Sequence, residues 1–533
     1  MTSENPNERR WRLPRWLRLP RRGGTAAPDE GRDADGESQA RRKPRFQPTP
    51  LGLFGVMLAA MFVTLLLIQT FTGTFRAGDD PAPEERERSP DPVATPPEGT
   101  ARIMVAGDSI VQGSSGDYTW RYRLWKHLDE RSGADVVFVG PYDDMLDVNT
   151  SAGGNHDYAD PDFDREHAGR WGASTGDVTE RIGEQVAEFE PHYLLLMAGI
   201  NDLAAGRSAQ ESLDNLVEAV VTARVAHGGL QIVLGEITPV WGTGRDEELN
   251  EQVAEFNRGL PALGEQLSGD GSPVVVAHSA EDYAPAEDNW DTTHPNPRGE
   301  QKIAAAFADA LSERLSLGDL YPRPLPDVEV GPRGRTGISA EDDNGEVVLT
   351  WDPVPGATRY QVLQKRVRPL PDELVPLPAD IDGTQEEAGI DNLLSGATYE
   401  FVIQPYKGDD GGLRSEPVEI TVDDEPPDAP ESVRIEDGGQ TLAWSEVDEA
   451  GHYEIWRRPL DCEAHGNGDP ECEPQDDLGP DGGEGWASSG IVEDDTEWAI
   501  TADGGGGYEL VVRSHRDFVE GEYSDPVVLE AGE

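Results

Sequence analysis

Residues 102–109 read RIMVAGDS, a short apolar run that ends in a glycine, an acid and a serine. Further short apolar runs follow along the chain, at residues 135–139 (DVVFV), 193–197 (YLLLM), 231–234 (QIVL) and 273–277 (PVVVA). Continuous apolar strands, as opposed to strands that alternate with polar residues, are typical of parallel sheets that are buried on both faces.

The segments between these runs repeat their apolar residues at helical spacing. Val178, Ile182 and Val186 share one face of a predicted helix, and Ile303, Phe307 and Leu311 share one face of the last helix. Strands and helices in alternation predict an α/β domain over residues 101–317, with a parallel sheet covered by helices. Sites in such sheets form beyond the carboxyl ends of the strands, which is where residues 107–109 lie.

Ser109 is the candidate nucleophile, because it directly follows the first predicted strand. A neutral serine hydroxyl needs an adjacent base to attack a carbonyl carbon. His294 stands just before the last predicted helix and has a carboxylate, Asp291, three residues earlier. That spacing lets Asp291 hold one imidazole nitrogen and leaves the other for the serine, the arrangement of a catalytic triad.

Asn201 lies in the sequence Gly199-Ile200-Asn201-Asp202, after the apolar run at 193–197. Its side-chain amide could donate a hydrogen bond to a developing oxyanion. The alternative for Asn201 and for Asp202 is a helix cap, because both residue types cap helices well.

These motifs resemble, in their order along the chain, those of the SGNH/GDSL hydrolase family: GDS at 107–109, a glycine, GIND at 199–202 and DTTH at 291–294. The resemblance implies a flavodoxin-like three-layer α/β/α fold and ester hydrolysis through an acyl-enzyme, with neither metal nor cofactor. It also implies an oxyanion hole that is formed by the amides of Ser109 and a glycine together with Asn201. Gly172 is the expected glycine, and Gly169 is the competing candidate.

The C-terminal part of the chain contains an internal repeat. VVLTWDPVPGATRYQVLQK, from Val347, is similar to QTLAWSEVDEAGHYEIWRR, from Gln440. Short alternating strands predict two all-β sandwiches, at 327–424 and 427–531, with Trp351 and Trp444 in their cores. The first resembles a fibronectin type III domain through Leu393-x-x-Gly396-x-x-Tyr399; the second is also assigned as fibronectin type III-like, although an insertion at 462–484 departs from the pattern.

The N-terminal part predicts a single-pass membrane protein. Residues 1–50 form a basic tail with 12 Arg and Lys against 7 Asp and Glu, and residues 47–75 carry no formal charge. A helix over 51–71 is long enough to span the bilayer, and the flanking basic residues predict a cytoplasmic N-terminus. Residues 76–100 are a Pro-rich acidic linker, so the later domains are expected outside the cell. The alternative is a cleaved signal peptide.

The overall charge excludes one class of partner. The chain of 533 residues has a formal net charge of −60, so a nucleic-acid backbone would be repelled. The two cysteines, Cys462 and Cys472, are expected to form a disulfide in an oxidising compartment, because a zinc site would need more ligands.

The predicted function is therefore that of an extracellular, membrane-anchored carboxylic ester hydrolase. The segments around GDSI and DTTHPN resemble family members that act on acetylated carbohydrates, which favours short acyl groups and an acetylated polysaccharide as substrate. A lipase or lysophospholipase is the alternative enzyme, and a non-catalytic surface adhesion module is the alternative outside enzymology.

Overall fold

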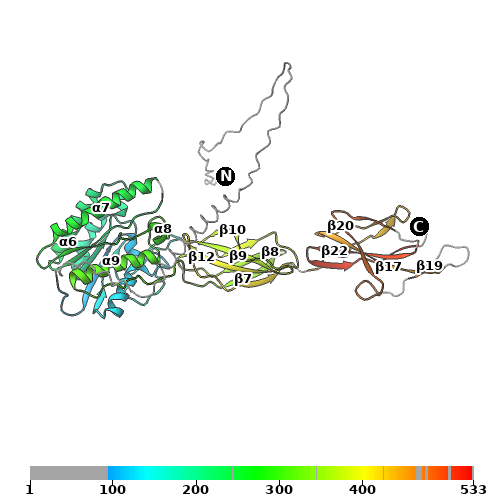
Figure 1. Cartoon of the computed structure of the whole chain (residues 1–533), viewed down its shortest axis with the longest axis horizontal. Helices are drawn as coiled ribbons and strands as arrows, with labels where there is room; N and C mark the ends of the chain where they lie inside the picture. Colours follow the sequence, from blue (N-terminus) through cyan, green and yellow to red (C-terminus); the bar gives the residue numbers. More distant parts are fainter. Residues whose placement is uncertain are drawn as a thin grey trace, which may run out of the picture. The chain divides into compact units, whose positions relative to one another are not determined.

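The computed structural model describes residues 94–530 apart from positions 243, 344, 424, 464–470, 474–477 and 502–505 (Figure 1). The predicted basic tail, the predicted membrane helix at 51–71 and most of the linker at 76–100 lie outside these residues. Within the described part of the chain, no helix is long and apolar enough to cross a membrane.

The first domain contains a parallel sheet, as the apolar runs predict. Its main strands are β1 (Ala101–Gly107), β2 (Val136–Phe138), β4 (Tyr193–Met197), β5 (Gln231–Gly235) and β6 (Val274–Ala277). They follow the order β2-β1-β4-β5-β6, and the two-residue β3 (Ala168–Gly169) also pairs with β1. Counted along the chain without β3, this order is 2-1-3-4-5, the order of flavodoxin-like doubly wound sheets.

Helices cover both faces of this sheet. One hydrophobic cluster packs alternate strand residues against α4 (Thr175–Phe189), α6 (Ala209–Ala226) and α7 (Arg245–Leu267). The other packs the opposite strand residues against α3 (Thr119–Lys126) and α9 (Pro297–Leu315). The long helices α6, α7 and α9 are labelled in Figure 1. The parallel α/β fold class is confirmed.

Short helices follow the carboxyl ends of the strands. The four-residue α2 (Ser109–Gln112) begins two residues after β1, and α5 (Ile200–Ala204) begins three residues after β4. Towards the end of the domain, α8 (Pro285–Asp288) leads into the loop before α9. The π-helical turn η1 (His127–Arg131) continues α3. The predicted site residues are therefore carried by segments at one edge of the sheet.

The C-terminal part of the described chain consists of antiparallel β-sheets. One sandwich pairs β11-β8-β7 with β10-β9-β12-β13, and the next pairs β15-β16-β21 with β20-β17-β22-β23; β14 and β24 join β12 and β22. The strands are β7 (Ile338–Asp343), β8 (Glu346–Trp351), β9 (Arg359–Arg368), β10 (Val375–Asp382), β11 (Glu387–Ile390), β12 (Thr398–Lys407), β13 (Asp410–Gly411), β14 (Val418–Thr421), β15 (Arg434–Glu436), β16 (Thr441–Ala443), β17 (His452–Pro459), β20 (Ala487–Glu493), β21 (Glu497–Ala499), β22 (Tyr508–Arg516), β23 (Val519–Tyr523) and β24 (Val527–Leu529).

The two halves of the internal repeat form the same interactions. Trp351 packs on Tyr360, whose hydroxyl accepts a hydrogen bond from the Val354 amide at 2.7 Å. Trp444 packs on Tyr453, which accepts from Val447 at 2.8 Å. Both tryptophans are buried in their cores, as predicted.

The two cysteines lie opposite each other in a small ladder. The strands β18 (Asp461–Glu463) and β19 (Glu471–Glu473) are antiparallel, with Cys462 aligned to Cys472. The side chain of Cys472 lies outside the described residues, so the disulfide stays a prediction.

Candidate active site

Ser109, His294 and Asp291 form a continuous chain of hydrogen bonds. The Oγ of Ser109 lies 3.0 Å from His294 Nε2, and His294 Nδ1 lies 2.7 Å from Asp291 Oδ2. The serine is 185 residues from the histidine in sequence, and the sheet edge brings them together. The arrangement leaves Nε2 to accept the serine proton while Nδ1–H donates to the carboxylate.

The carboxylate of Asp291 is held in its ionised form. Burial acts to raise the pKa of Asp291, but the hydrogen bond to His294, the charge of that ring and the backbone amides of Thr293 and His294 outweigh it, so the pKa is lowered. Oδ1 accepts from both amides, at 2.8 and 2.6 Å. One carboxylate oxygen therefore fixes the loop, and the other orients the imidazole.

Two tryptophans that the sequence analysis did not single out contact the imidazole of His294. Trp171 stacks on it with ring centres 4.2 Å apart, and Trp290 stacks at 5.7 Å. Trp241 also donates from its indole to the Asp291 carbonyl oxygen. These rings limit the rotation of the base and separate it from bulk water.

Asn201 and Gly172 lie on two separate segments of the same edge. The side chain of Asn201 donates to the Ala173 carbonyl at 3.0 Å, which uses one of its two N–H groups. Gly172 is exposed in the turn closed by the hydrogen bond from Ala173 N to Arg170 O, with a φ of +73°. That backbone conformation favours glycine.

The backbone amide of Gly169, the competing candidate for the oxyanion hole, already has an acceptor within the fold. It lies in β3, and its amide donates to Nδ1 of His167 at 3.1 Å. A donor already used inside the fold is poorly suited to stabilise an oxyanion, which favours Gly172.

A polar network fixes the turn that contains Gly172. The amide of Trp171 donates to Gln112 Oε1 at 2.8 Å, and Gln112 Nε2 donates to Asp144 Oδ2 at 3.2 Å. Arg170 pairs with the other oxygen of Asp144 at 2.8 Å. Gln112 ends α2, so this network connects the nucleophile's helix to the glycine turn. No short sequence motif marks these residues.

Asp202 does not reach the reacting groups. Its buried carboxylate accepts from the amide of Thr175 at 2.8 Å and from its hydroxyl at 2.9 Å, and it pairs with Arg207 at 3.1 Å. Because Thr175 begins α4, Asp202 connects α5 to that helix. The sequence analysis left open a helix-capping role for Asp202. Asp202 does accept from the first amide of a helix, but that helix is α4 and not α5, in which Asp202 itself lies.

Asp108, next to Ser109, is a buried acid. Burial raises its pKa to about 7, although the amide of Ile110 and the charge of His294 act to lower it. Its Oδ1 accepts from Ile110 N at 3.0 Å and so caps α2. Between pH 4 and pH 7 the folded chain therefore holds a proton here that the unfolded chain has released, and this contribution to stability is lost as the pH rises.

Replacing Asp108 with asparagine is expected to remove this pH dependence. Asparagine keeps an oxygen for the Ile110 amide but cannot ionise. From pH 5 to pH 8, the free energy of unfolding of the wild type should fall relative to that of Asp108→Asn by on the order of 3 kcal/mol. Urea denaturation of both proteins at the two pH values measures this difference. Parallel pH profiles would contradict the raised pKa.

Two cavities adjoin the catalytic groups. Ser109 and His294 line a small one of about 10 Å³, together with Ile110, Trp171 and other residues, which is about the room that one water molecule requires. A wider cleft of about 550 Å³ shares Trp171 with it. The wider cleft is lined by Gln112, Asp143, Asp144, Leu146, Gly153, Gly154, His156, Arg170 and Trp171.

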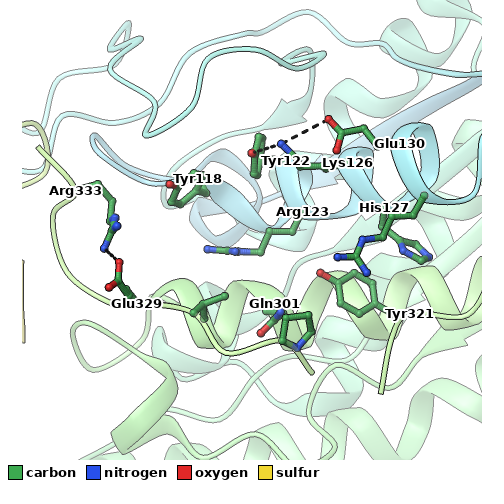
Figure 2. Close-up of a pocket in the computed structure, with 13 residues that line it drawn as sticks. Tyr118, Tyr122, Arg123, Lys126, His127, Glu130, Gln301, Tyr321, Glu329 and Arg333 are labelled. Carbon is green, nitrogen blue, oxygen red and sulfur yellow. Dashed lines mark hydrogen bonds and ion pairs between the residues drawn. The ribbon is translucent and has the colours of Figure 1, made fainter. Parts of the chain in front are cut away.

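Another cavity, of about 370 Å³, does not contain the catalytic groups (Figure 2). Tyr118, Tyr122 and Tyr321 contribute rings to its walls. Three of its cations have carboxylate partners: Lys126 pairs with Glu130, Arg333 with Glu329, and Arg123 with Glu300. Ser109 and His294 both line the small cavity of about 10 Å³ and not this one.

Comparison with known proteins finds similar sequences and structures. The model of the GDSL-like lipase/acylhydrolase family matches residues 105–302. A multidomain esterase from Ruminococcus flavefaciens is 24% identical over 327 residues, which cover 57% of this chain and 40% of that protein. This chain thus spans less than half the length of that relative.

Solved structures resemble separate parts of the chain. A family 3 carbohydrate esterase from Talaromyces cellulolyticus is 23% identical, covers 39% of this chain and 94% of its own, and has a TM-score of 0.33. A two-domain fibronectin type III segment of chicken tenascin is 15% identical, covers 38% of this chain and 99% of its own, and has a TM-score of 0.22. The resemblance of residues 105–302 to the GDSL-like lipase/acylhydrolase family, which the sequence motifs predict, is confirmed by the match to the family model, and it supports the prediction of a carboxylic ester hydrolase.

Proposed function

We propose that this chain is a serine esterase that removes short acyl groups, above all O-acetyl groups of carbohydrates, and that it works outside the cell on a membrane anchor. The observation that carries the proposal is the hydrogen-bonded series Ser109–His294–Asp291, with distances of 3.0 and 2.7 Å. A nucleophile, a base and an orienting carboxylate are what acyl transfer through a covalent intermediate requires.

The proposed reaction has two halves. Ser109 Oγ attacks the ester carbonyl carbon while its proton passes to His294 Nε2, and the same proton then goes to the leaving alcohol as the C–O bond breaks. A water molecule next gives a proton to His294 and attacks the carbonyl carbon of the acyl-enzyme. The bond to Ser109 Oγ then breaks, His294 returns the proton to Oγ, and the acid is released. In both halves the tetrahedral oxyanion is held by the amides of Ser109 and Gly172 and by the side-chain N–H of Asn201.

The small cavity supports a short acyl group. Its volume of about 10 Å³ has room for a group the size of a methyl, since a water molecule requires about as much. Ile110 and the rings of Trp120 and Trp171 line it. A long acyl chain would have to displace these side chains, which disfavours the lipase and lysophospholipase alternative.

The wider cleft supports a polar alcohol. Asp143, Asp144, His156 and Arg170 all line it, and such a set of hydrogen-bonding groups suits a polyhydroxylated leaving group. With the acetyl methyl in the small cavity, the alcohol side of the ester extends past Trp171 into this cleft. The proposed substrate class is therefore an O-acetylated carbohydrate.

The proposed location depends on the sequence. Residues 47–75 carry no formal charge and follow a basic tail, as in a membrane anchor with a cytoplasmic N-terminus. The acidic Pro-rich stretch at 76–100 would then keep the catalytic domain away from the lipid surface. Fractionation of cells that express the full chain, followed by protease treatment of intact cells, tests this location.

A series of p-nitrophenyl esters tests the substrate proposal. We expect kcat/KM to fall by on the order of 100-fold from acetyl to octanoyl, since several methylenes cannot enter the small cavity and one alone is worth about 10-fold or more. Palmitoyl ester should be inert, and acetylated xylan should release acetate. A preference for octanoyl or palmitoyl would favour the lipase, and no turnover of any ester would favour the adhesion module.

A further inference from the structure

The first sandwich contacts both loops that carry the catalytic residues. The described residues all fall within one compact unit, residues 87–533. At the turn between β12 and β13, Lys407, the last residue of β12, and Asp410, the first residue of β13, form hydrogen bonds to the α/β domain. On the basis of the proposed esterase function, we propose that Lys407 is a positioning residue, which holds the loop after the nucleophile in the geometry that catalysis needs.

All three N–H groups of the Lys407 ammonium donate hydrogen bonds to one loop of the α/β domain, residues 114–117. Nζ donates to Ser114 Oγ at 2.8 Å, to the Ser115 carbonyl at 2.8 Å and to Asp117 Oδ1 at 2.5 Å. Lys407 is only 5% exposed. A lysine is rarely buried to this extent unless it is paired, so the ammonium is part of a built interaction.

The loop at 114–117 is directly continuous with the nucleophile's helix. The Gly113 amide donates to the Ser109 carbonyl at 2.9 Å. Asp117 Oδ2 then accepts from both the amide and the hydroxyl of Ser114 at 2.8 Å. Ser114 and Asp117 line the same small cavity as Ser109. A shift of this loop would therefore move the wall against which the acyl group lies.

Lys407 also supplies the charge that this loop requires. Asp117 and Glu300 both line the small cavity, and burial raises the pKa of Glu300, with Asp117 adding to that rise. Arg123 pairs with Glu300 at 2.9 Å, and Lys407 pairs with Asp117. The side chain of Asp117 is only 10% exposed. Without Lys407 it would be a largely buried carboxylate without its cation, which strongly favours rearrangement of the loop.

The turn between β12 and β13 also contacts the loop that contains His294. The Lys407 ammonium lies 5.0 Å from the ring centre of Trp290, the ring that stacks on His294. Asn296, which caps α9 just after His294, donates to Asp410 at 2.9 Å. A Cβ at Gly408 would overlap the carbonyl oxygen of Trp290. The turn thus supports the base as well as the nucleophile.

The loop at 114–117 also contacts the first sandwich directly through its backbone. A Cβ on Gly116 would overlap the Pro355 carbonyl oxygen, and a Cβ on Gly356 would overlap the Ser115 carbonyl oxygen. The loop that Lys407 binds is therefore also packed against the sandwich through its backbone.

Lys407→Met in the full chain tests the proposal. We expect kcat for p-nitrophenyl acetate to fall by on the order of 100-fold, the effect of a displacement of about 1 Å in an active site, with little change in KM. The rate at which a fluorophosphonate labels Ser109 should fall in parallel. Lys365→Met is the matched control, because Lys365 pairs with Glu400 within the same sandwich at 2.8 Å and should leave both rates unchanged.

The double variant Lys407→Met/Asp117→Asn separates positioning from general destabilisation. If Lys407 acts through Asp117, the double variant should be no less active than Lys407→Met, because the uncompensated carboxylate is gone. Losses that multiply, a Lys407→Met variant with wild-type kcat, or an equal loss in Lys365→Met would overturn the proposal. A wild type that hydrolyses no ester would refute the esterase function alone, since the labelling rates still compare Lys407→Met with wild type.

Discussion

Replacing Ser109 with alanine is expected to lower turnover of p-nitrophenyl acetate by on the order of 10⁴-fold or more. The Oγ of Ser109 lies 3.0 Å from Nε2 of His294, the base in the proposed reaction. Thermal unfolding should change little, because the substitution removes one hydrogen bond and leaves the backbone of α2 intact. Initial rates and a circular-dichroism melt measure the two effects.

Ser212→Ala is the control for that experiment. Ser212 is a buried serine in α6 whose hydroxyl donates to the Ser208 carbonyl at 3.1 Å, so its loss perturbs the fold to a similar degree without touching the site. It should retain wild-type kcat. Turnover by Ser109→Ala above one hundredth of the wild-type rate would show that another group is the nucleophile.

Replacing Asp291 with asparagine is expected to cost on the order of 10⁴-fold in kcat. The oxygen Oδ1 accepts from the amides of Thr293 and His294, so an asparagine must keep its oxygen on that side and turn its NH₂ towards His294. Nδ1 must then accept a hydrogen bond, which moves the ring proton to Nε2. A protonated Nε2 cannot take the proton of Ser109, so the substitution produces the wrong tautomer in an intact loop.

The measurement compares kcat and KM of Asp291→Asn with those of Asp288→Asn. Asp288 lies three residues earlier and is buried, and its carboxylate pairs with Lys302 at 2.6 Å. Asp288→Asn should lose stability and retain kcat. A loss of less than tenfold in Asp291→Asn would contradict the tautomer argument, and a proton-detected NMR spectrum of the imidazole N–H groups would identify the tautomer directly.

The sequence predicted the parts of this protein that depend on local patterns. The apolar run before Gly107 forms β1. Asp291 and His294, three residues apart, form a direct hydrogen bond because both lie in one short turn. Ser109 and His294 are 185 positions apart. Their pairing could still be expected, because the carboxyl ends of parallel strands share one edge of the sheet.

Other features depend on surfaces that exist only after folding. Trp171 and Trp290 contact His294 through rings that carry no spacing motif. Lys407 lies 293 residues from Ser114, and nothing in its own strand distinguishes it from a solvent-exposed lysine. The membrane helix at 51–71 stays a prediction from hydropathy, since it lies outside the described residues.

The facing glycines Gly116 and Gly356 have a consequence for how this enzyme can evolve. Because each glycine lacks a Cβ, the backbone of the other domain can approach it closely. A side chain at either position would therefore require the facing backbone to move. Recombination that joined this α/β domain to an unrelated sandwich would have to supply a glycine, a lysine at 407 and a compatible turn together. The α/β domain and its first sandwich are therefore expected to be inherited as a single unit.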